Sequence, residues 1–231
     1  MGREGELCAV LIREAVLKMQ YKRFPLGALW TNGYLFWDED GEAFFIDPGG
    51  DASEVLKFVK AHNLKLRKVL LTHGHLDHIA GVRDLTSLVG SEVYVGRGDA
   101  RLLRNPPESL QTALRIHCDP ITDFQEVAEG QTLRVGKIEA QVMETPGHTE
   151  GGVCYLIAEG DEKVLASGDT LFAHSVGRTD LDGGDEAKLN ASLLRLAKLP
   201  DDLRVLGTVR KRTSERRGHT TPSGPWSLKR F

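Results

Sequence analysis

The residues best suited to chemistry lie in one short run, Thr72 to His78, which reads THGHLDH. It places three of the chain's eight histidines and one aspartate within six residues. Neutral imidazoles and carboxylates suit a divalent ion such as zinc. His73 and His75 alternate and can point into one site, and Asp77 and His78 can face a second ion beside the first. The density of ligand-type residues argues against a polar loop that is His-rich by chance.

Two further segments carry polar residues of the same kind. The sequence TPGHT at 145–149 holds His148, and SGDT at 167–170 holds Asp169. A lone histidine in a loop is usually solvated, but His148 shares its place after a predicted strand with the first run. Asp169 can cap a turn or, as a carboxylate, bridge two metals.

The elements that must position these residues follow from apolar runs and turn signals. Strands mixed with single helices predict a layered α/β domain with helices packed outside one or two sheets. The stretch 96–129, with prolines at 106, 107 and 120, is the least legible. Strands are expected at 21–24, 31–37, 42–46, 68–71, 92–95, 132–135, 138–144, 153–157, 163–167 and 203–206, and helices at 53–63 (capped by Ser53 or Asp51), from about 78 to 89 and at 185–199.

Composition excludes several classes of function. A net charge of −3 and a pI near 6.3 give no basic surface for nucleic acid or an anionic membrane. Widely spaced Cys8, Cys118 and Cys154 indicate free thiols in a reducing compartment. No apolar run approaches the roughly 20 residues of a membrane helix, and the first residues do not read as a signal peptide. We therefore expect a cytoplasmic protein, and the sequence leaves its oligomeric state open.

Taken together, the motifs resemble a known family. HxHxDH at 73–78, TPGHT at 145–149, GDTLF at 168–172 and GRTD at 177–180 are similar to those of the metallo-β-lactamase superfamily, and most similar to its glyoxalase II-type (hydroxyacylglutathione hydrolase-like) branch. The resemblance covers about 21–206 and implies an αββα sandwich with a dinuclear metal site at one edge. It implies that His73, His75 and His148 hold the first metal, that Asp77 and His78 hold the second, that Asp169 bridges both, and that Asp77 also orients the metal-bound water.

The resemblance also implies an outer layer of residues. Asp47 in DPGG and the GRTD turn with Arg178 and Asp180 would orient the ligands. A surface ion pair is an equally good interpretation of Arg178 and Asp180. His174, after GDTLFA, is the remaining histidine best placed to approach a substrate, whereas His62 and His117 read as surface residues.

The implied chemistry is hydrolysis of a small-molecule thioester of the hydroxyacylglutathione type. Two Zn²⁺ ions, or iron or manganese in their place, would lower the pKa of a shared water and supply hydroxide. A metal would also stabilise the tetrahedral oxyanion. A thiol with a pKa near 8.5 leaves with little protonation, so a metal pair alone could cleave a thioester.

The sequence departs from the family at its C-terminal end. It lacks room for the helical region that helps glyoxalase II bind glutathione, which leaves the thiol of the substrate open. The family completes its second metal with a histidine in a Pro-Gly-His-Gly turn after the last strand, but Gly207, Thr208 and Val209 follow here. His219 is the only histidine beyond them, and we interpret it as a coincidence. The second site is therefore expected to be incomplete.

A shifted reading frame accounts for this departure. Codons allowed for Val205 to Glu215, read from the third base, encode Pro-Gly-His-Gly-Pro-Glu-Thr-Asp-Ile-Gly. We therefore predict a frameshift near Val205–Leu206. The chain then divides into an N-terminal extension at 1–18, a metallo-β-lactamase-fold domain at 19–206 and an aberrant, disordered tail at 207–231. The extension is either sequence upstream of a natural start at Met19 or a genuine helix.

Two rival functions remain open at this point. One is a mononuclear-iron persulfide dioxygenase, a relative that shares the first-metal ligands; the intact pair of Asp77 and His78 and the GRTD turn favour the hydrolase. The other is a catalytically impaired remnant, a fold that survives without the last ligand of the second metal. Metal content and thioester hydrolysis distinguish the three.

Overall fold

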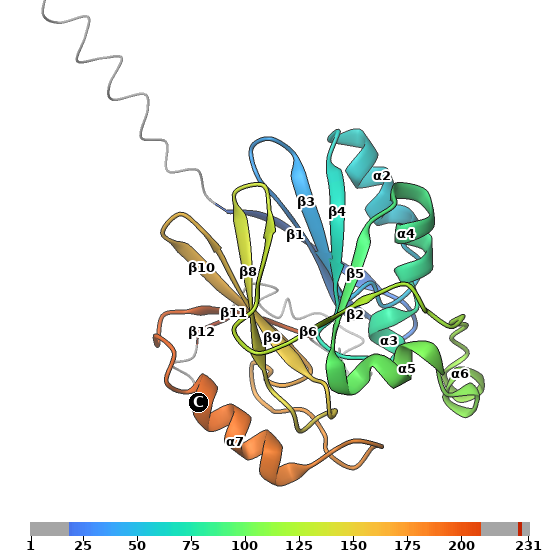
Figure 1. Ribbon diagram of the computed structural model, residues 1–231, viewed down its shortest axis with the longest axis vertical. Coiled ribbons are helices and arrows are strands. Elements are labelled where there is room, and N and C mark those ends of the chain that lie inside the picture. The colour runs from blue at the N-terminus through green and yellow to red at the C-terminus, as the bar shows by residue number, and fades with distance from the viewer. Residues whose placement is uncertain (1–18, 209–225, 228–231) are drawn as a thin grey trace, which may run out of the picture.

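Two six-stranded sheets face each other, and helices cover their outer sides (Figure 1). The computed structural model describes residues 19–208 and 226–227. The predicted αββα sandwich is confirmed. The N-terminal extension at 1–18 and the tail residues 209–225 and 228–231 lie outside the described residues, so the predictions for them remain predictions. The tail residues that the structure describes in strands differ from the predicted disorder: Gly207 ends the strand Arg204–Gly207, and Trp226–Ser227 pairs with that strand.

The first sheet supplies most of the edge on which the candidate site is built. Its first three strands pair antiparallel, whereas β3 to β6 run parallel. Parallel neighbours end at the same edge of a sheet, so the loops after β3, β4 and β5 meet there. The strands, in spatial order, are β1 (Gln20–Leu26), β2 (Thr31–Trp37), β3 (Glu42–Ile46), β4 (Lys65–Leu70), β5 (Glu92–Gly96) and β6 (Gln125–Val127).

The second sheet contributes two more loops to that edge, after β8 and after β10. All its neighbours are antiparallel except β10 and β11, which are parallel. In spatial order the strands are β12 (Trp226–Ser227), β11 (Arg204–Gly207), β10 (Glu162–Gly168), β9 (Val153–Glu159), β8 (Ile138–Glu144) and β7 (Thr132–Val135).

Alternate residues of the inner strands serve two different cores. Phe36 and Phe44 stack with ring centroids 5.0 Å apart between the sheets, in the same cluster as Tyr155 of the second sheet. Leu35 and Phe45 point the other way, towards α2 (Ser53–Ala61) and α4 (Val82–Val89). Burial on both faces explains why these strands are continuous apolar runs. On the far side, α7 (Glu186–Leu196) covers the second sheet.

The prediction of one continuous helix from about His78 to Val89 is wrong, because the chain forms two separate helices there. α3 (Leu76–Ile79) ends before Gly81, and α4 begins at Val82. The Gly81 amide donates to the carbonyl of Pro48 at 2.7 Å, and a side chain at this position would overlap the Gly50 carbonyl. This close packing of backbone on backbone leads the chain out of the helix and holds α3 beside the loop that follows β3.

Several other boundaries differ from the prediction. Ala52, not Ser53 or Asp51, is the N-cap of α2, and the Asp51 carboxylate instead accepts a bond from the Ser53 amide. The stretch 96–129, for which the sequence predicts no clear elements, contains the short 3-10 helix η1 (Arg97–Asp99), α5 (Ala100–Arg104) and α6 (Glu108–Leu114). Within the described residues, no helix is long and apolar enough to cross a membrane.

Candidate metal centre

The structure brings all six predicted metal ligands to one edge of the sandwich. Each follows a strand: His73 and His75 lie on the loop after β4, Asp77 and His78 in the helix α3 that continues it, His148 on the loop after β8 and Asp169 on the loop after β10. Two overlapping groups of metal-ligand atoms result, in each of which the atoms lie within 4.8 Å of one another. Among the described residues, His73, His75 and His148 make the first group, and His73, His78 and Asp169 make the second; Asp77 lies in neither, and its carboxylate is 3.9 Å from Nε2 of His78.

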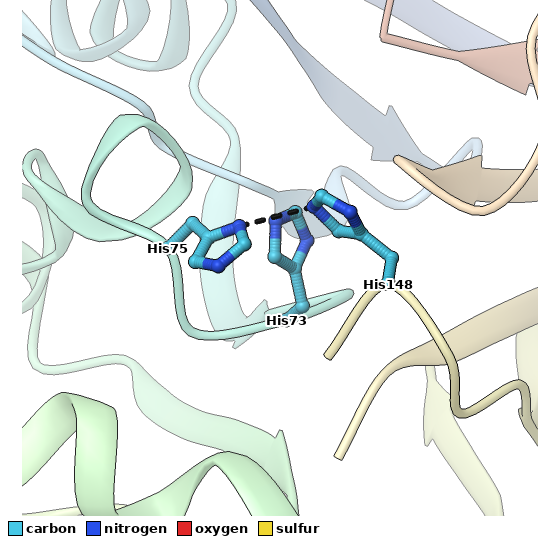
Figure 2. A group of neighbouring side chains, drawn as sticks. All are labelled: His73, His75 and His148. Atoms are coloured by element: carbon cyan, nitrogen blue, oxygen red, sulfur yellow. Dashed lines mark hydrogen bonds between the residues drawn. The ribbon is translucent and has the colours of Figure 1, made fainter. Parts of the chain in front are cut away.

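The first group is a triangle of imidazoles from two loops (Figure 2). Ring centroids lie 4.7 Å apart for His73 and His75, 4.8 Å for His73 and His148, and 4.7 Å for His75 and His148. Nδ1 of His75 is 3.0 Å from Nε2 of His148. His73 and His148 are buried, and His75 is partly exposed, so the group is reached from the side of His75.

Hydrogen bonds behind the rings determine which nitrogen faces the site. Nδ1 of His148 lies 2.7 Å from the carbonyl oxygen of Arg178, which can only accept, so this nitrogen carries the proton. The lone pair of Nε2 is then directed into the group. Such outer hydrogen bonds set the tautomer and orientation of metal-binding histidines.

A single buried carboxylate, that of Asp47, plays this part for two more histidines. It lies 2.9 Å from Nδ1 of His78 and accepts bonds from the Thr72 amide at 2.8 Å and the Thr72 hydroxyl at 2.6 Å. Because the hydroxyl donates to Asp47, its oxygen is free to accept from Nδ1 of His73, 3.1 Å away. Asp47 thus contacts one predicted ligand directly and a second through Thr72, and its supporting role stays a prediction.

The second group contains one carboxylate, that of Asp169, and the Asp77 carboxylate lies beside it. Nε2 of His78 lies 3.4 Å from Oδ1 of Asp169 and 3.9 Å from Oδ2 of Asp77. The other oxygen of Asp169 is 3.6 Å from Nε2 of His148. The Asp169 carboxylate therefore lies between the two groups, where the resemblance places a bridging ligand. Asp77 is held in turn by Thr31, whose hydroxyl donates to Oδ2 at 3.0 Å.

The electrostatics differ between the two groups. Burial, and then the neighbouring His148, lower the pKa of His75 to about 4, which keeps its imidazole neutral. Burial opposes a charge on His78 as well, but the surrounding carboxylates, led by Asp47, raise its pKa well above the usual value. Neutral nitrogens in the first group and added carboxylates in the second are a donor set that fits divalent metal ions.

Three further predicted residues lie at the surface. Arg178 donates to the Asp180 carboxylate through two bonds of 2.6 Å, and both side chains are largely exposed. This is the geometry of the surface ion pair, whereas the backbone carbonyl of Arg178 is the part that contacts His148. His174 is exposed.

Sequence reasoning missed Thr31, Thr72 and Asp99. Asp99 is buried and accepts hydrogen bonds from the loops that carry His75 and His148. The available signal was its position: Asp99 follows β5 at the same edge at which Asp47 follows β3. Thr31 is the first residue of β2, and Thr72 directly precedes His73. No sequence pattern sets either threonine apart from the others.

Comparisons with known proteins agree with this fold. The family model described as the metallo-beta-lactamase superfamily matches residues 26–208. The hydroxyacylglutathione hydrolase GloC of Haemophilus influenzae is 32% identical over 81% of this chain and 89% of its own. Two solved structures are also similar. The BLEG-1 B3 metallo-beta-lactamase is 35% identical with a TM-score of 0.72, and the match covers 82% of this chain and 91% of that one. TTHA1623 in a di-iron-bound form is 31% identical with a TM-score of 0.74, and the match covers 90% of this chain and 95% of that one.

Proposed function

The chain is a metallo-hydrolase of the metallo-beta-lactamase superfamily, and we propose that it cleaves thioesters of the hydroxyacylglutathione type. The observation that carries the proposal is the convergence of three imidazoles on one point beside a shared carboxylate, that of Asp169. Similarity to GloC supports the choice of a thioester. Zn²⁺ is the proposed metal, with iron or manganese as the alternatives.

The residues of the chain would hold and orient the metal. His73, His75 and His148 would bind the first ion, and His78, Asp77 and Asp169 would bind the second. Bound divalent ions supply an activated water and polarise the scissile carbonyl. Outer hydrogen bonds, which the rings of His78 and His148 donate to the Asp47 carboxylate and the Arg178 carbonyl, would keep these rings in the required tautomers. Thr31 fixes the Asp77 carboxylate next to the same space.

A thioester matches what these residues offer. A thiolate of pKa near 8.5 departs without a proton from the protein. The described site needs no dedicated acid on the leaving-group side for such a substrate. An amide would require one, which is why we favour the thioester over the amide.

The two ions should bind unequally. The first has a complete set of histidines, whereas the family's last ligand of the second is missing from the sequence after β11. We therefore expect tight binding of one ion and weak binding of the other. A chain with this defect is a slow enzyme that a higher concentration of free metal stimulates.

Hydrolysis of two thioesters and one non-thioester tests the proposal. The zinc-loaded full chain is mixed with a hydroxyacylglutathione, with the same acyl group on coenzyme A, and with a chromogenic cephalosporin as a non-thioester. Cleavage of the glutathione thioester, abolished in His148→Ala and kept in the surface variant His117→Ala, is the expected result. His117 is exposed and lies against Asp119, away from the metal ligands, which makes it a matched control.

Other outcomes select other functions. Equal rates on both thioesters would retain the thioesterase and remove the preference for glutathione. Oxygen consumption with a persulfide by an iron-loaded chain would replace hydrolysis with dioxygenase chemistry. Turnover of the cephalosporin alone would overturn the proposed substrate. No activity in any assay would identify the chain as a remnant of the fold.

A further inference from the structure

The turn after β5 is wedged between the two loops that carry the first group of histidines. A side chain at Gly98 would come within 2.7 Å of the Glu150 backbone, and one at Gly74 within 2.8 Å of Cβ of Leu102. Both glycines thus mark places where backbone packs directly against the neighbouring segment. On one side of the turn lies the loop of His73 and His75, and on the other the loop of His148.

Asp99, the last residue of η1, binds both loops at once. Its Oδ2 accepts from the amide of Gly74 at 2.8 Å and from the hydroxyl of Thr149 at 2.7 Å. Its Oδ1 accepts from the amide of Gly151 at 2.7 Å. The residue is 1% exposed, so the carboxylate is withdrawn from water and satisfied by these three donors.

Two of the three donors lie immediately beside proposed metal ligands. Gly74 sits between His73 and His75, and Thr149 follows His148. The two loops are far apart in the chain, yet Nδ1 of His75 and Nε2 of His148 are 3.0 Å apart. A carboxylate that accepts from both loops fixes the separation of the backbones from which these rings project.

We propose that Asp99 is a positioning residue of the metal centre, which sets the spacing between His75 and His148 by joining their loops. The inference rests on the metal site of the proposed function and is independent of its substrate. A carboxylate is well suited to joining the two loops, because hydrogen bonds to an ionised carboxylate are about twice as strong as those between neutral groups. Outer residues of this kind typically change metal affinity by about 10–100-fold when they are replaced.

The variant Asp99→Asn tests the inference with little change of shape. Its amide nitrogen must face the N–H of either Gly74 or Gly151, so one of the loops loses its acceptor. We expect zinc affinity, measured by competition with a chromogenic chelator, to fall about 10-fold. The ligand-field spectrum of the cobalt-substituted protein should change in intensity, because the geometry at His75 and His148 relaxes. Asp123→Asn makes the same chemical change at an exposed carboxylate and should leave both measurements unaltered.

A second variant keeps the test decisive if Asp99→Asn does not fold. Thr149→Val removes one hydroxyl and preserves the side-chain shape, and the two backbone donors still reach Asp99. We expect a smaller loss of zinc affinity, of about 2–5-fold, on the scale of one lost hydrogen bond, and a spectral change in the same direction. Combining both substitutions should lower affinity by less than the product of the separate effects, since they share one bond.

The result that would overturn the inference is equally specific. Zinc affinity within twofold of the parent and an unchanged cobalt spectrum in a folded Asp99→Asn, or in Thr149→Val where the former fails to fold, would make Asp99 a packing residue only. Metal binding is measured without substrate, so failure of the thioesterase proposal leaves this test intact.

Discussion

The carboxylate of Asp47 lies 2.9 Å from Nδ1 of His78, and both side chains are buried. Asp47 reaches this position from a left-handed backbone conformation, with φ of +53°. Only a few non-glycine residues adopt such a conformation, and aspartate and asparagine are favoured among them. Strain of this kind persists where the surroundings hold the residue in place, here through the amide and hydroxyl of Thr72.

Asp47→Asn should damage the second metal site more than the fold. Asparagine tolerates the same backbone conformation, but its amide nitrogen must replace an acceptor for either His78 or the Thr72 amide. We expect a loss of about 10–100-fold in affinity for the weaker ion, measured by titration of the zinc-depleted chain. The melting temperature should stay close to that of Asp123→Asn. A large drop in melting temperature with unchanged affinity would show that Asp47 is only structural.

Gly168→Ala should displace Asp169 and destabilise the protein. Gly168 has a φ of +49°, and a side chain there would overlap that of Thr72. The left-handed conformation costs an alanine about 1–2 kcal/mol, and the overlap adds about 1–3 kcal/mol. The free energy of unfolding, from denaturant melts, measures the sum.

Gly160→Ala is the matched control for that overlap. Gly160 has a similar φ of +57° in the turn between β9 and β10, and nothing lies within 4 Å of a side chain placed there. Gly160→Ala should therefore lower the free energy of unfolding only by the cost of the left-handed conformation. Equal destabilisation by both substitutions would contradict the packing of Gly168 against Thr72.

Glu42 should make the stability of the first sheet depend on pH. Hydrogen bonds from Arg67 and then Lys65 lower the pKa of this carboxyl to about 2, from an ordinary value of 4.5. A depressed pKa means that its contribution is present above about pH 4.5 and is lost as the pH falls towards 2. The difference in free energy of unfolding between the parent and Glu42→Gln should therefore shrink over this window. A difference independent of pH would refute the assigned ion pairs.

Much of the fold could be predicted from local pattern. β2, β3, β7 and β8 have the predicted bounds, because each is an apolar or alternating run closed by a turn. The break at Gly81 could not be predicted, since its cause is the carbonyl of Pro48 on another loop. Asp99 was missed for the same reason: its partners Gly74, Thr149 and Gly151 are 25, 50 and 52 residues away in the chain.

The candidate metal ligands are easier to predict from the sequence than the residues that hydrogen-bond to them. His73, His75, Asp77 and His78 are adjacent in sequence, so their chemistry is visible in one line. Which ring nitrogen faces the site depends on acceptors such as the Arg178 carbonyl, 30 residues from His148. Local sequence carries no trace of such a contact.

Restoring the Pro-Gly-His-Gly turn after Leu206 should complete the second site. The restored histidine adds a nitrogen donor to the group of His73, His78 and Asp169, beside the Asp77 carboxylate. We expect the restored chain to retain about two zinc ions after dialysis, since structural zinc sites with full ligand sets bind tightly, and to hydrolyse thioesters faster. Unchanged metal content would mean that solvent or another residue already completes the site in the chain as it stands.

Metal stoichiometry by elemental analysis tests the central claim most directly. The full chain is loaded with zinc, dialysed, and compared with His148→Ala and His117→Ala. We predict about one retained ion in the parent and in His117→Ala, and none in His148→Ala, because three histidines are needed to hold the ion. Retention of the ion in His148→Ala, or no retained ion in the parent, would contradict the metal centre described above.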